Sequence, residues 1–460
     1  MSIPTRSLRR LAPSLAVKRA LRTPHTTSFR FVSSKPPASF QEASNAVKKE
    51  KVMFPGARDS YFTSQFSFTA GEGKGLQTFR AMDAKGALCQ GGPSEADLGI
   101  DKDLARKLYR EMIQLNTLDV IMYEAQRQGR ISFYMTSYGE ESLIGSASAL
   151  RPEDVVFGQY REAGVLLYRG FTIKEFMDQC YGNMDDSGKG RQMPVHFGCS
   201  RLNFHTISSP LTTQLPQASG AAYALKREAT GGEGRVVMCY FGEGAASEGD
   251  FHAALNMAAT LGCPTIFYCR NNGFAISTPS TEQYVGDGIA SRGIGYGIET
   301  IRVDGNDVWA VRYATEQARK MALGEGGKGS PRPVLIEALT YRVGHHSTSD
   351  DSSAYRSKEE VEDWRRKDDP MTRLRRFLES RDWWSPEEEK STREEIRKAV
   401  LAEFSKAEGR AKPPISELFT DVYDRLTPRL REQQAEMERL VREYPEYYTS
   451  VREHKDSENI

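Results

Sequence analysis

Two short motifs hold the side chains of this sequence with the clearest capacity for chemistry. Gly242-Glu243-Gly244 directly follows the apolar run Val236–Phe241, and Arg270-Asn271-Asn272 directly follows the apolar run Thr265–Cys269. Short apolar runs of this kind are typical of strands that are buried on both faces of a parallel sheet. Because parallel strands end at the same edge, where ligands bind, we expect Glu243 and Asn272 to converge there.

These side chains suit a divalent cation that holds a diphosphate. Glu243 offers a carboxylate, Asn272 an amide oxygen and the following peptide a carbonyl, and Mg²⁺ binds such oxygens together with phosphate oxygens and water. Glycines at 242 and 244 let the backbone approach a ligand closely, and the helix expected from near Asp250 offers free N–H groups to an anion. With Asn272 29 residues after Glu243, the pair resembles the thiamine diphosphate signature.

Two other interpretations fit part of this pattern. Gly242-Glu243-Gly244 alone is compatible with an ordinary strand-to-helix turn, or with the start of a dinucleotide-binding turn, whose glycine spacing begins in the same way. However, Ser247 stands where that turn would have its third glycine, and the Asn-Asn pair has no part in it. The two motifs together favour thiamine diphosphate.

The surrounding chain predicts an α/β fold. Strand-like runs alternate with helical stretches between residues 150 and 345, which indicates a mostly parallel sheet with helices on both faces. Leu104 to Ala125 repeat apolar residues every three or four positions and Gly129 follows, which predicts a core-facing helix from Asp101. The other expected elements are strands at Asp154–Phe157, Glu299–Val303 and Val334–Ala338, and helices at Ser219–Glu228 and Asp250–Leu261.

Composition divides the chain into four parts. Residues 1–45 read as a mitochondrial transit peptide, because residues 1–41 hold eight Lys or Arg and no acid, although another kind of basic tail has the same composition. Residues 46–100 are rich in Gly, Pro and Asp and predict an extended arm. Residues 101–357 form the α/β core, and residues 358–460 are charged and predict a helical extension that wraps the core or a partner subunit.

Charge and cysteine content exclude several classes of protein. The 63 Lys and Arg nearly balance the 62 Asp and Glu, so a net charge of +1 argues against a basic nucleic-acid binder. No apolar run approaches the roughly 20 residues of a membrane-spanning helix. The six cysteines form no CxxC pair, so we expect buried free thiols rather than a zinc site.

From about residue 50 to 440 the chain resembles the alpha subunits of the mitochondrial branched-chain 2-oxo acid dehydrogenases, which have a thiamine diphosphate-binding fold. The stretches that carry the resemblance are QRQGRISFYMTSYGEES (126–142), FGQYREAGVLLYRG (157–170), GKGRQMPVHFG (188–198), ISSPLTTQLPQA (207–218), FGEGAASEGD (241–250), RNNGFAISTP (270–279) and YRVGHHSTSDDSSAYRS (341–357).

The resemblance assigns residues to a cofactor site. Mg²⁺ is expected on Glu243, Asn272 and the backbone carbonyl of Phe274, where the family usually has Tyr; a backbone contact tolerates that change. Arg161 and Arg270, with Tyr160 and His346, match positions that hold the diphosphate, and guanidinium groups bind phosphate oxygens well. Taken singly, however, an arginine is more often part of a surface ion pair. The expected thiamine diphosphate contacts are Tyr160, Arg161, Ser209, Leu211, Glu243, Gly244, Ala245, Arg270 and His346.

The resemblance also implies a K⁺ site and a catalytic loop. The K⁺ ligands match Ser208, Pro210, Thr213 and Gln214. His346 is expected to face the cofactor and to assist proton transfer, although a His-His pair is equally compatible with structural imidazoles. Ser347 and Ser357 match phosphorylation positions. A phosphate adds roughly −1.5 to −2 charge, so we expect phosphorylation of Ser347 to inactivate the enzyme.

The implied activity is that of 3-methyl-2-oxobutanoate dehydrogenase, the oxidative decarboxylation of branched-chain 2-oxo acids with acyl transfer to a lipoyl group. The implied partners are a beta subunit in an α₂β₂ heterotetramer, a lipoyl-bearing acyltransferase, and a regulatory kinase and phosphatase, all in the mitochondrial matrix. A pyruvate dehydrogenase alpha subunit is the nearest alternative, but GEGAASEGD and GHHSTSDDSS favour branched-chain substrates. A Rossmann dehydrogenase and an inactive structural subunit are the alternatives from other classes.

Overall fold

The computed structural model describes residues 75–228, 234–325 and 329–459. The predicted transit peptide, most of the predicted arm and parts of the two Gly-rich loops therefore lie outside the described residues, and the four-part division of the chain stays a prediction.

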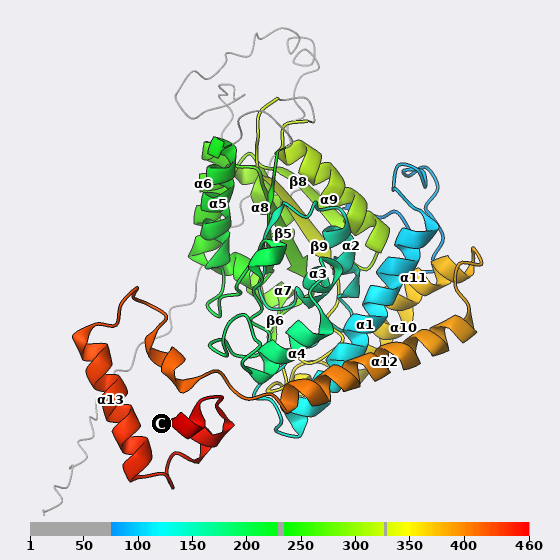
Figure 1. Cartoon of the computed structure of the whole chain (residues 1–460). Coiled ribbons are helices and arrows are strands. Elements are labelled where there is room, and N and C mark those ends of the chain that lie inside the picture. Colours follow the sequence, from blue (N-terminus) through cyan, green and yellow to red (C-terminus); the bar gives the residue numbers. More distant parts are fainter. Residues whose placement is uncertain (1–74, 229–233, 326–328, 460) are drawn as a thin grey trace, which may run out of the picture. The chain divides into compact units, whose positions relative to one another are not determined.

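A seven-stranded sheet, in which every strand pair is parallel, lies at the centre of the fold (Figure 1). The strand order is β1-β8-β9-β5-β4-β2-β3. The five strands expected from the sequence are all present, so the α/β prediction is confirmed. The strands are β1 (Thr78–Phe79), β2 (Val155–Phe157), β3 (Phe204–His205), β4 (Val237–Gly242), β5 (Thr265–Asn271), β8 (Glu299–Asp304) and β9 (Val334–Leu339).

Helices cover both faces of this sheet, as the apolar strands require. Successive side chains of a strand point to opposite faces, and along β4 Met238 and Tyr240 join one buried cluster while Cys239 and Phe241 join another. The first cluster includes α1 (Lys102–Arg127), α3 (Ala163–Tyr168) and α9 (Val308–Ala322), and the second includes α5 (Gln214–Glu228) and α6 (Gly249–Leu261).

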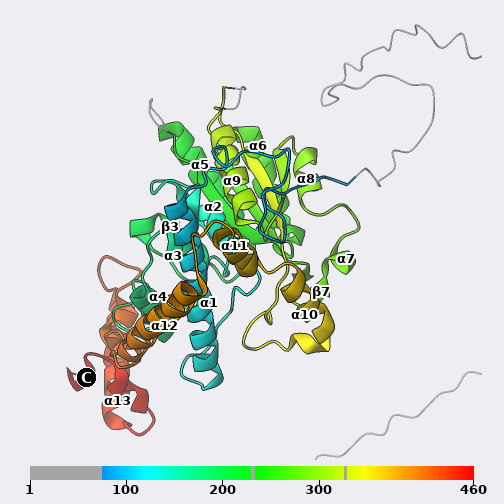
Figure 2. The same ribbon diagram turned by 90° about the vertical axis from the view of Figure 1, so that its right-hand side faces the viewer.

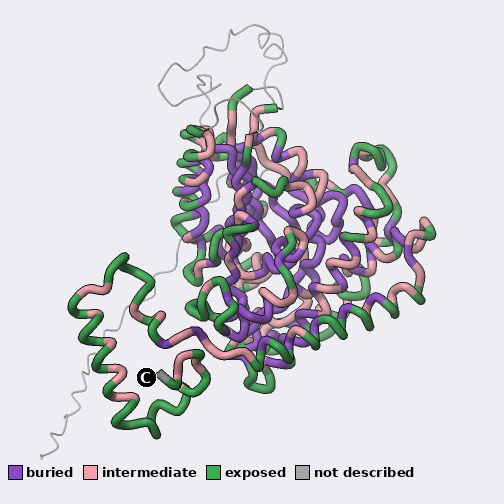
Figure 3. The backbone as a smooth tube through the Cα atoms, in the orientation of Figure 1, coloured by how far each residue is buried: buried purple, intermediate pink, exposed green. Residues whose placement is uncertain are grey.

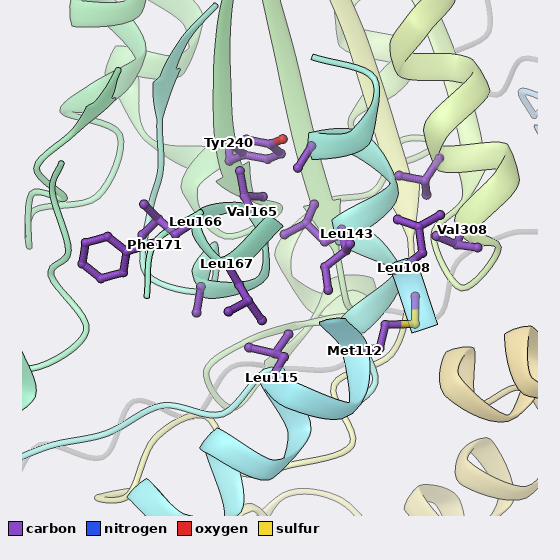
Figure 4. Packing of buried hydrophobic residues seen from close by; sticks show 14 of the residues in the cluster. Leu108, Met112, Leu115, Leu143, Val165, Leu166, Leu167, Phe171, Tyr240 and Val308 are labelled. Atoms are coloured by element: carbon purple, nitrogen blue, oxygen red, sulfur yellow. The ribbon is translucent and has the colours of Figure 1, made fainter. Parts of the chain in front are cut away.

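Helix α1 packs across the larger cluster and confirms the helix expected from Asp101. The Asp101 carboxylate accepts hydrogen bonds from the N–H groups of Asp103 and Leu104, both at 2.9 Å, and so begins the helix. Leu108, Met112 and Leu115 then point toward Leu143, Leu166, Leu167 and Val308 (Figure 4).

The chain after residue 358 is helical, as predicted. Helices α10 (Lys358–Lys367), α11 (Pro370–Glu379), α12 (Pro386–Glu408) and α13 (Pro428–Glu443) follow one another, and α11 and α12 pack beside α1 (Figure 2). Phe377 and Val400 are fully buried in the core. By contrast, α13 has no buried residue (Figure 3).

The described part of the predicted arm is attached to the sheet. β1 pairs with β8, and Asp307 holds the segment that follows β1: its Oδ2 accepts the N–H groups of Ala81 and Met82 at 2.7 and 2.6 Å. The Oδ1 of the same carboxylate caps α9 by accepting the N–H groups of Trp309 and Ala310 at 3.0 and 3.1 Å. Asp307 thus joins the N-terminal strand to the core.

Two expectations about side chains and membranes also agree with the structure. All six cysteines are free, and all but Cys89 are buried. None of the described helices is long and apolar enough to span a membrane.

We predict that Asp307→Ala destabilises the protein by about 3 kcal/mol or more, because it removes a helix cap and leaves two further buried N–H groups unpaired. Thermal unfolding of the purified protein would measure the loss. The matched control is Asp101→Ala, which removes an exposed cap and should cost about 1 kcal/mol. Equal shifts in the two unfolding midpoints would contradict the prediction.

Candidate functional site

The predicted site residues lie at the carboxyl edge of the sheet. Strands β9, β5, β4 and β2 are neighbours, and β4 pairs with β5 so that Gly242 lies opposite Arg270. Glu243 follows β4, Asn272 follows β5, and Arg161 lies on the loop after β2. The expectation that Glu243 and Asn272 converge at one edge of the sheet is confirmed.

Glu243 and Asn272 are in direct contact. The backbone N–H of Asn272 donates to Glu243 Oε2 at 3.3 Å, and the N–H of Phe274 donates to Asn272 Oδ1 at 3.3 Å. Both side chains are buried. Gln159 fixes the turn before Glu243, because its Oε1 accepts the N–H of Gly242 at 3.0 Å.

One oxygen of Glu243 has no partner. Its Oε1 is buried without a hydrogen bond, and burial, more than any other influence, raises the pKa of Glu243 to about 7. An unpaired buried carboxylate oxygen is costly, and a divalent cation would offset that cost. The chemistry of the donor set therefore fits Mg²⁺, with a carboxylate, an amide oxygen and a carbonyl.

The carbonyl of Phe274 lies beside a cation that the sequence analysis did not select. Phe274 is in β6 (Phe274–Ala275), which pairs with β7 (Thr278–Pro279), and its carbonyl accepts a hydrogen bond from Arg342 Nη1 at 3.3 Å. A carbonyl oxygen has two lone pairs, so this bond leaves one for a metal. In addition, β6 covers the Gly244 turn, because a Cβ at Gly244 would lie 2.9 Å from the Cβ of Ala275.

Arg270 is held between two buried carboxylates. Its Nε lies 2.5 Å from Glu140 Oε2 and its Nη2 lies 3.4 Å from Glu162 Oε1. Burial opposes the charge of Arg270, but Glu162 and Glu140 outweigh this effect and raise its pKa. Its Nη1 is buried without a hydrogen-bond partner, which leaves one arm of the guanidinium for an anion such as a diphosphate.

Arg161 and Tyr160 surround His346. Arg161 Nη2 donates to the backbone carbonyl of His346 at 2.6 Å, and the Tyr160 ring meets the imidazole edge-on at 5.8 Å between centroids. Burial, followed by Arg161 and Arg342, lowers the pKa of His346 to about 3, so the ring is neutral at pH 7. Arg161 Nη2 also lies 3.4 Å from Nδ1. Because a guanidinium only donates, we infer that the ring proton is on Nε2.

The loop expected to hold K⁺ joins the site to helix α5. Ser209 Oγ is hydrogen bonded to His196 Nε2 at 2.8 Å, and Gln214 Nε2 donates to the carbonyl of Tyr240 at 3.0 Å. Leu211 is 39% exposed, so a thiamine contact there needs the ligand to reach an open face. Hydroxyl, carbonyl and amide oxygens are available in this loop, and the K⁺ assignment stays a prediction.

The two asparagines of the motif point to different surroundings. The Asn272 amide contacts Glu140 and the N–H of Phe274. In contrast, Asn271 Nδ2 donates to Glu337 Oε1 at 2.8 Å and to the hydroxyl of Tyr284 at 3.0 Å. Glu337 also accepts the N–H groups that begin α8 (Ala290–Gly295). The Asn271 amide nitrogen is thus engaged within the fold, and Asn272 is the candidate ligand of the pair.

Comparison with known protein families identifies the family of this chain. The family model described as "Dehydrogenase E1 component" matches residues 109–416, which include the whole candidate site. The chain belongs to the dehydrogenase E1 component family. Among the described residues no group of three or more His, Cys, Asp or Glu could hold a metal.

Several relatives of this E1 chain are named as alpha subunits. "2-Oxoisovalerate dehydrogenase subunit alpha, mitochondrial" from Homo sapiens is 55% identical over 416 residues, covering 90% of this chain and 91% of that protein. The protein of the same name from Caenorhabditis elegans is 55% identical over 395 residues, covering 85% and 89%. "2-Oxoisovalerate dehydrogenase subunit alpha 1, mitochondrial" from Arabidopsis thaliana is 47% identical over 403 residues, covering 87% and 83%.

Sequence reasoning missed the charged partners of the expected ligands. Glu140, Glu162 and Arg342 contact predicted site residues, and Gln159 contacts Gly242, which directly precedes Glu243. Glu140, Gln159 and Glu162 belong to the stretches YGEES and GQYRE, within the E1 match. Their only sequence signal was a set of charged or polar residues among apolar ones, and this signal does not reveal which side chain they contact.

We predict that His346 remains neutral far below the ordinary pKa of 6.5. Because its folded-state pKa is lower than its unfolded value, its contribution to stability is complete above pH 6.5 and is lost as the pH falls toward 3. Diethyl pyrocarbonate reacts with neutral imidazole, so its rate at His346, followed by peptide mass spectrometry, should change little between about pH 7.5 and 5.5. N-acetylhistidine should slow about tenfold over this range, and a parallel fall at His346 would contradict the prediction.

Proposed function

We propose that this chain is the alpha subunit of the decarboxylating component of a branched-chain 2-oxo acid dehydrogenase. The observation that carries the proposal is the contact between Glu243 and Asn272, beside the unpartnered Glu243 Oε1 and Arg270 Nη1. An unpaired carboxyl oxygen of Glu243 and an unpaired guanidinium nitrogen of Arg270 in one buried cluster suit a divalent cation and a diphosphate bound together. The names of the relatives favour branched-chain substrates over pyruvate.

The residues of this chain would divide the work of holding the cofactor. Glu243, Asn272 and the Phe274 carbonyl would hold Mg²⁺, and Tyr160, Arg161, Arg270 and His346 would hold the diphosphate. Gly244 and Ala245 offer backbone contacts, and Ser209 and Leu211 are candidates for contact with the thiamine rings. Thiamine diphosphate, when bound, supplies the electron sink for decarboxylation, and the protein binds and orients it.

His346 is the candidate for a hydrogen-bond donor to the ligand. The neutral ring with its proton on Nε2 is a hydrogen-bond donor at that atom, and Arg161 holds the ring by both Nδ1 and the backbone carbonyl. A neutral imidazole among guanidinium groups orients a polar ligand without adding a further positive charge. We therefore assign His346 to orientation of the ligand through a hydrogen bond donated by Nε2.

A beta subunit would complete this site. Leu211 and Ile276 are 39% and 54% exposed at the edge of the site, and Met257 and Leu261 are exposed on α6. Exposed apolar side chains in such number are typical of a subunit interface, in keeping with an α₂β₂ heterotetramer. A lipoyl-bearing acyltransferase would receive the acyl group, and the mitochondrial matrix is the proposed location.

The K⁺ site and the regulation by phosphorylation belong to the same proposal. Ser208, Pro210, Thr213 and Gln214 would bind K⁺ and brace the loop that bears Ser209. A kinase and a phosphatase would act on Ser347 and Ser357. Ser347 is buried, whereas Ser357 is exposed and caps α10 by accepting the N–H of Glu360 at 3.1 Å.

We predict that the chain co-expressed with a candidate beta subunit decarboxylates 3-methyl-2-oxobutanoate at least about tenfold more efficiently than pyruvate, because each pocket methylene contributes about 1–3 kcal/mol. Activity should require thiamine diphosphate and Mg²⁺, and the chain alone should be inactive. Glu243→Gln should abolish Mg²⁺-dependent binding of the cofactor. A preference for pyruvate would favour the pyruvate dehydrogenase alternative, and NAD binding without Mg²⁺ would favour a nucleotide-binding protein.

We predict that Ser347→Glu lowers the activity of the complex by about 100-fold or more, because a buried position does not accommodate an added charge. Ser347 is 8% exposed, and the backbone N–H of neighbouring His346 already donates to Asp350 at 2.8 Å. Ser357→Glu is the matched control, since an anion at an exposed helix N-terminus is tolerated. Decarboxylation rates of the two variants provide the measurement, and similar losses in both would contradict the prediction.

A further inference from the structure

Glu140 is a buried carboxylate that touches three of the predicted site residues. It directly precedes η1 (Glu141–Leu143) and is 3% exposed. Its Oε1 accepts the Nδ2 proton of Asn272 at 2.9 Å, and its Oε2 lies 2.5 Å from Arg270 Nε. Arg161 Nε lies 3.9 Å from Oε1. Among the described residues, Glu140 alone contacts all three of these side chains.

The hydrogen bond from Asn272 determines which end of its amide faces the cation. A carboxylate only accepts hydrogen bonds, so Glu140 holds the NH₂ group of Asn272 and turns Oδ1 the other way. Oδ1 accepts only the N–H of Phe274, at 3.3 Å, which leaves a lone pair. In the flipped amide, Oδ1 would face the Glu140 carboxylate and the two oxygens would repel each other. The NH₂ group would face the metal and could not bind it, so the flipped orientation is disfavoured for two reasons.

The backbone that carries Glu140 is itself fixed to the end of β9. Gly139 has φ 87°, its N–H donates to Glu141 Oε2 at 3.0 Å, and its carbonyl accepts from Thr340 Oγ1 at 2.8 Å. A Cβ at Gly139 would lie 2.3 Å from the carbonyl oxygen of Tyr341. Glu140 is therefore held on a rigid support, as a residue that orients a metal ligand must be.

We propose that Glu140 is a positioning residue for the cofactor: it orients the Asn272 amide toward the metal and holds Arg270 so that Nη1 remains free for the diphosphate. This inference rests on the proposed function, because it requires a metal and a diphosphate at the site. It assigns Glu140 a role in metal affinity rather than in the chemical step.

The test is Glu140→Gln in the complex with the beta subunit. Glutamine carries no charge to hold Arg270 and can donate as well as accept, so the amide of Asn272 loses its fixed orientation. Loss of such an outer contact typically weakens metal binding by about 10–100-fold. Titration of Mg²⁺ at saturating thiamine diphosphate, followed by protein fluorescence, should show this loss, while kcat at saturating Mg²⁺ should change much less.

Asp154→Asn is the matched control. Asp154 is a fully buried carboxylate that, like Glu140, pairs with an arginine: its Oδ2 lies 2.8 Å from Arg319 Nε. It directly precedes β2, at the amino end of that strand, and its side chain binds Arg319 and the N–H groups of Arg151 and Val236 rather than Asn272 or Arg270. Asp154→Asn should therefore keep the Mg²⁺ affinity of the wild type. Thermal unfolding of both variants separates affinity from folding: a lower unfolding temperature with unchanged Mg²⁺ affinity in Glu140→Gln would overturn the proposal.

A charge-exchange variant gives a second, independent result. In Glu140→Gln/Asn272→Asp the hydrogen bond can form in the opposite direction and the total charge is preserved. Coupled residues deviate from additivity, so the double variant should bind Mg²⁺ at least about fivefold more tightly than the product of the single losses predicts. Additive losses would overturn the proposal. If instead the wild type shows no Mg²⁺-dependent cofactor binding, the proposed function itself fails.

Discussion

The candidate site depends on the register between β4 and β5. With Gly242 opposite Arg270, the residues after each strand meet at one edge, and Glu243 contacts the backbone of Asn272. A slip of one residue would turn every side chain of one strand to the other face of the sheet. The register is fixed by apolar side chains that are buried on both faces, so the hydrophobic core specifies the site as well as the fold.

A second requirement is the balance of buried charge. Glu140, Glu162 and Glu243 lie close to Arg161 and Arg270, and all five residues are buried. Buried ions are stable only when they are paired or bind a ligand. Five of their buried polar atoms make no hydrogen bond: Glu140 Oε2, Glu162 Oε1, Glu243 Oε1, Arg270 Nε and Arg270 Nη1. Ion pairs between Arg270 and the first two carboxylates account for three of these atoms, which leaves Glu243 Oε1 and Arg270 Nη1. Ligand binding thus completes a charge network that the protein has largely assembled.

The strand ends and the convergence of Glu243 with Asn272 were predictable because they follow from apolar periodicity and parallel pairing. The helix from Asp101 was predictable for the same reason. The contacts of Glu140 and Arg342 were not, because they join segments far apart in the chain: Glu140 is 132 residues from Asn272. The neutral state of His346 was equally out of reach, since burial and nearby guanidinium groups produce it. The periodicity of apolar residues predicts helices and strands. Contacts between side chains that are far apart in the sequence become visible only in the structure.

The divergent asparagines of the motif have a practical consequence. Asn271 binds Glu337 and Tyr284, and through Glu337 it is linked to the start of α8. The two adjacent asparagines therefore belong to separate networks: Asn272 lies in the candidate cofactor site, and Asn271 joins two parts of the fold. Substitution of either asparagine is expected to lower turnover, so activity alone would not distinguish the two positions. A parallel measurement of soluble yield would separate a folded variant that no longer binds metal from a variant that does not fold.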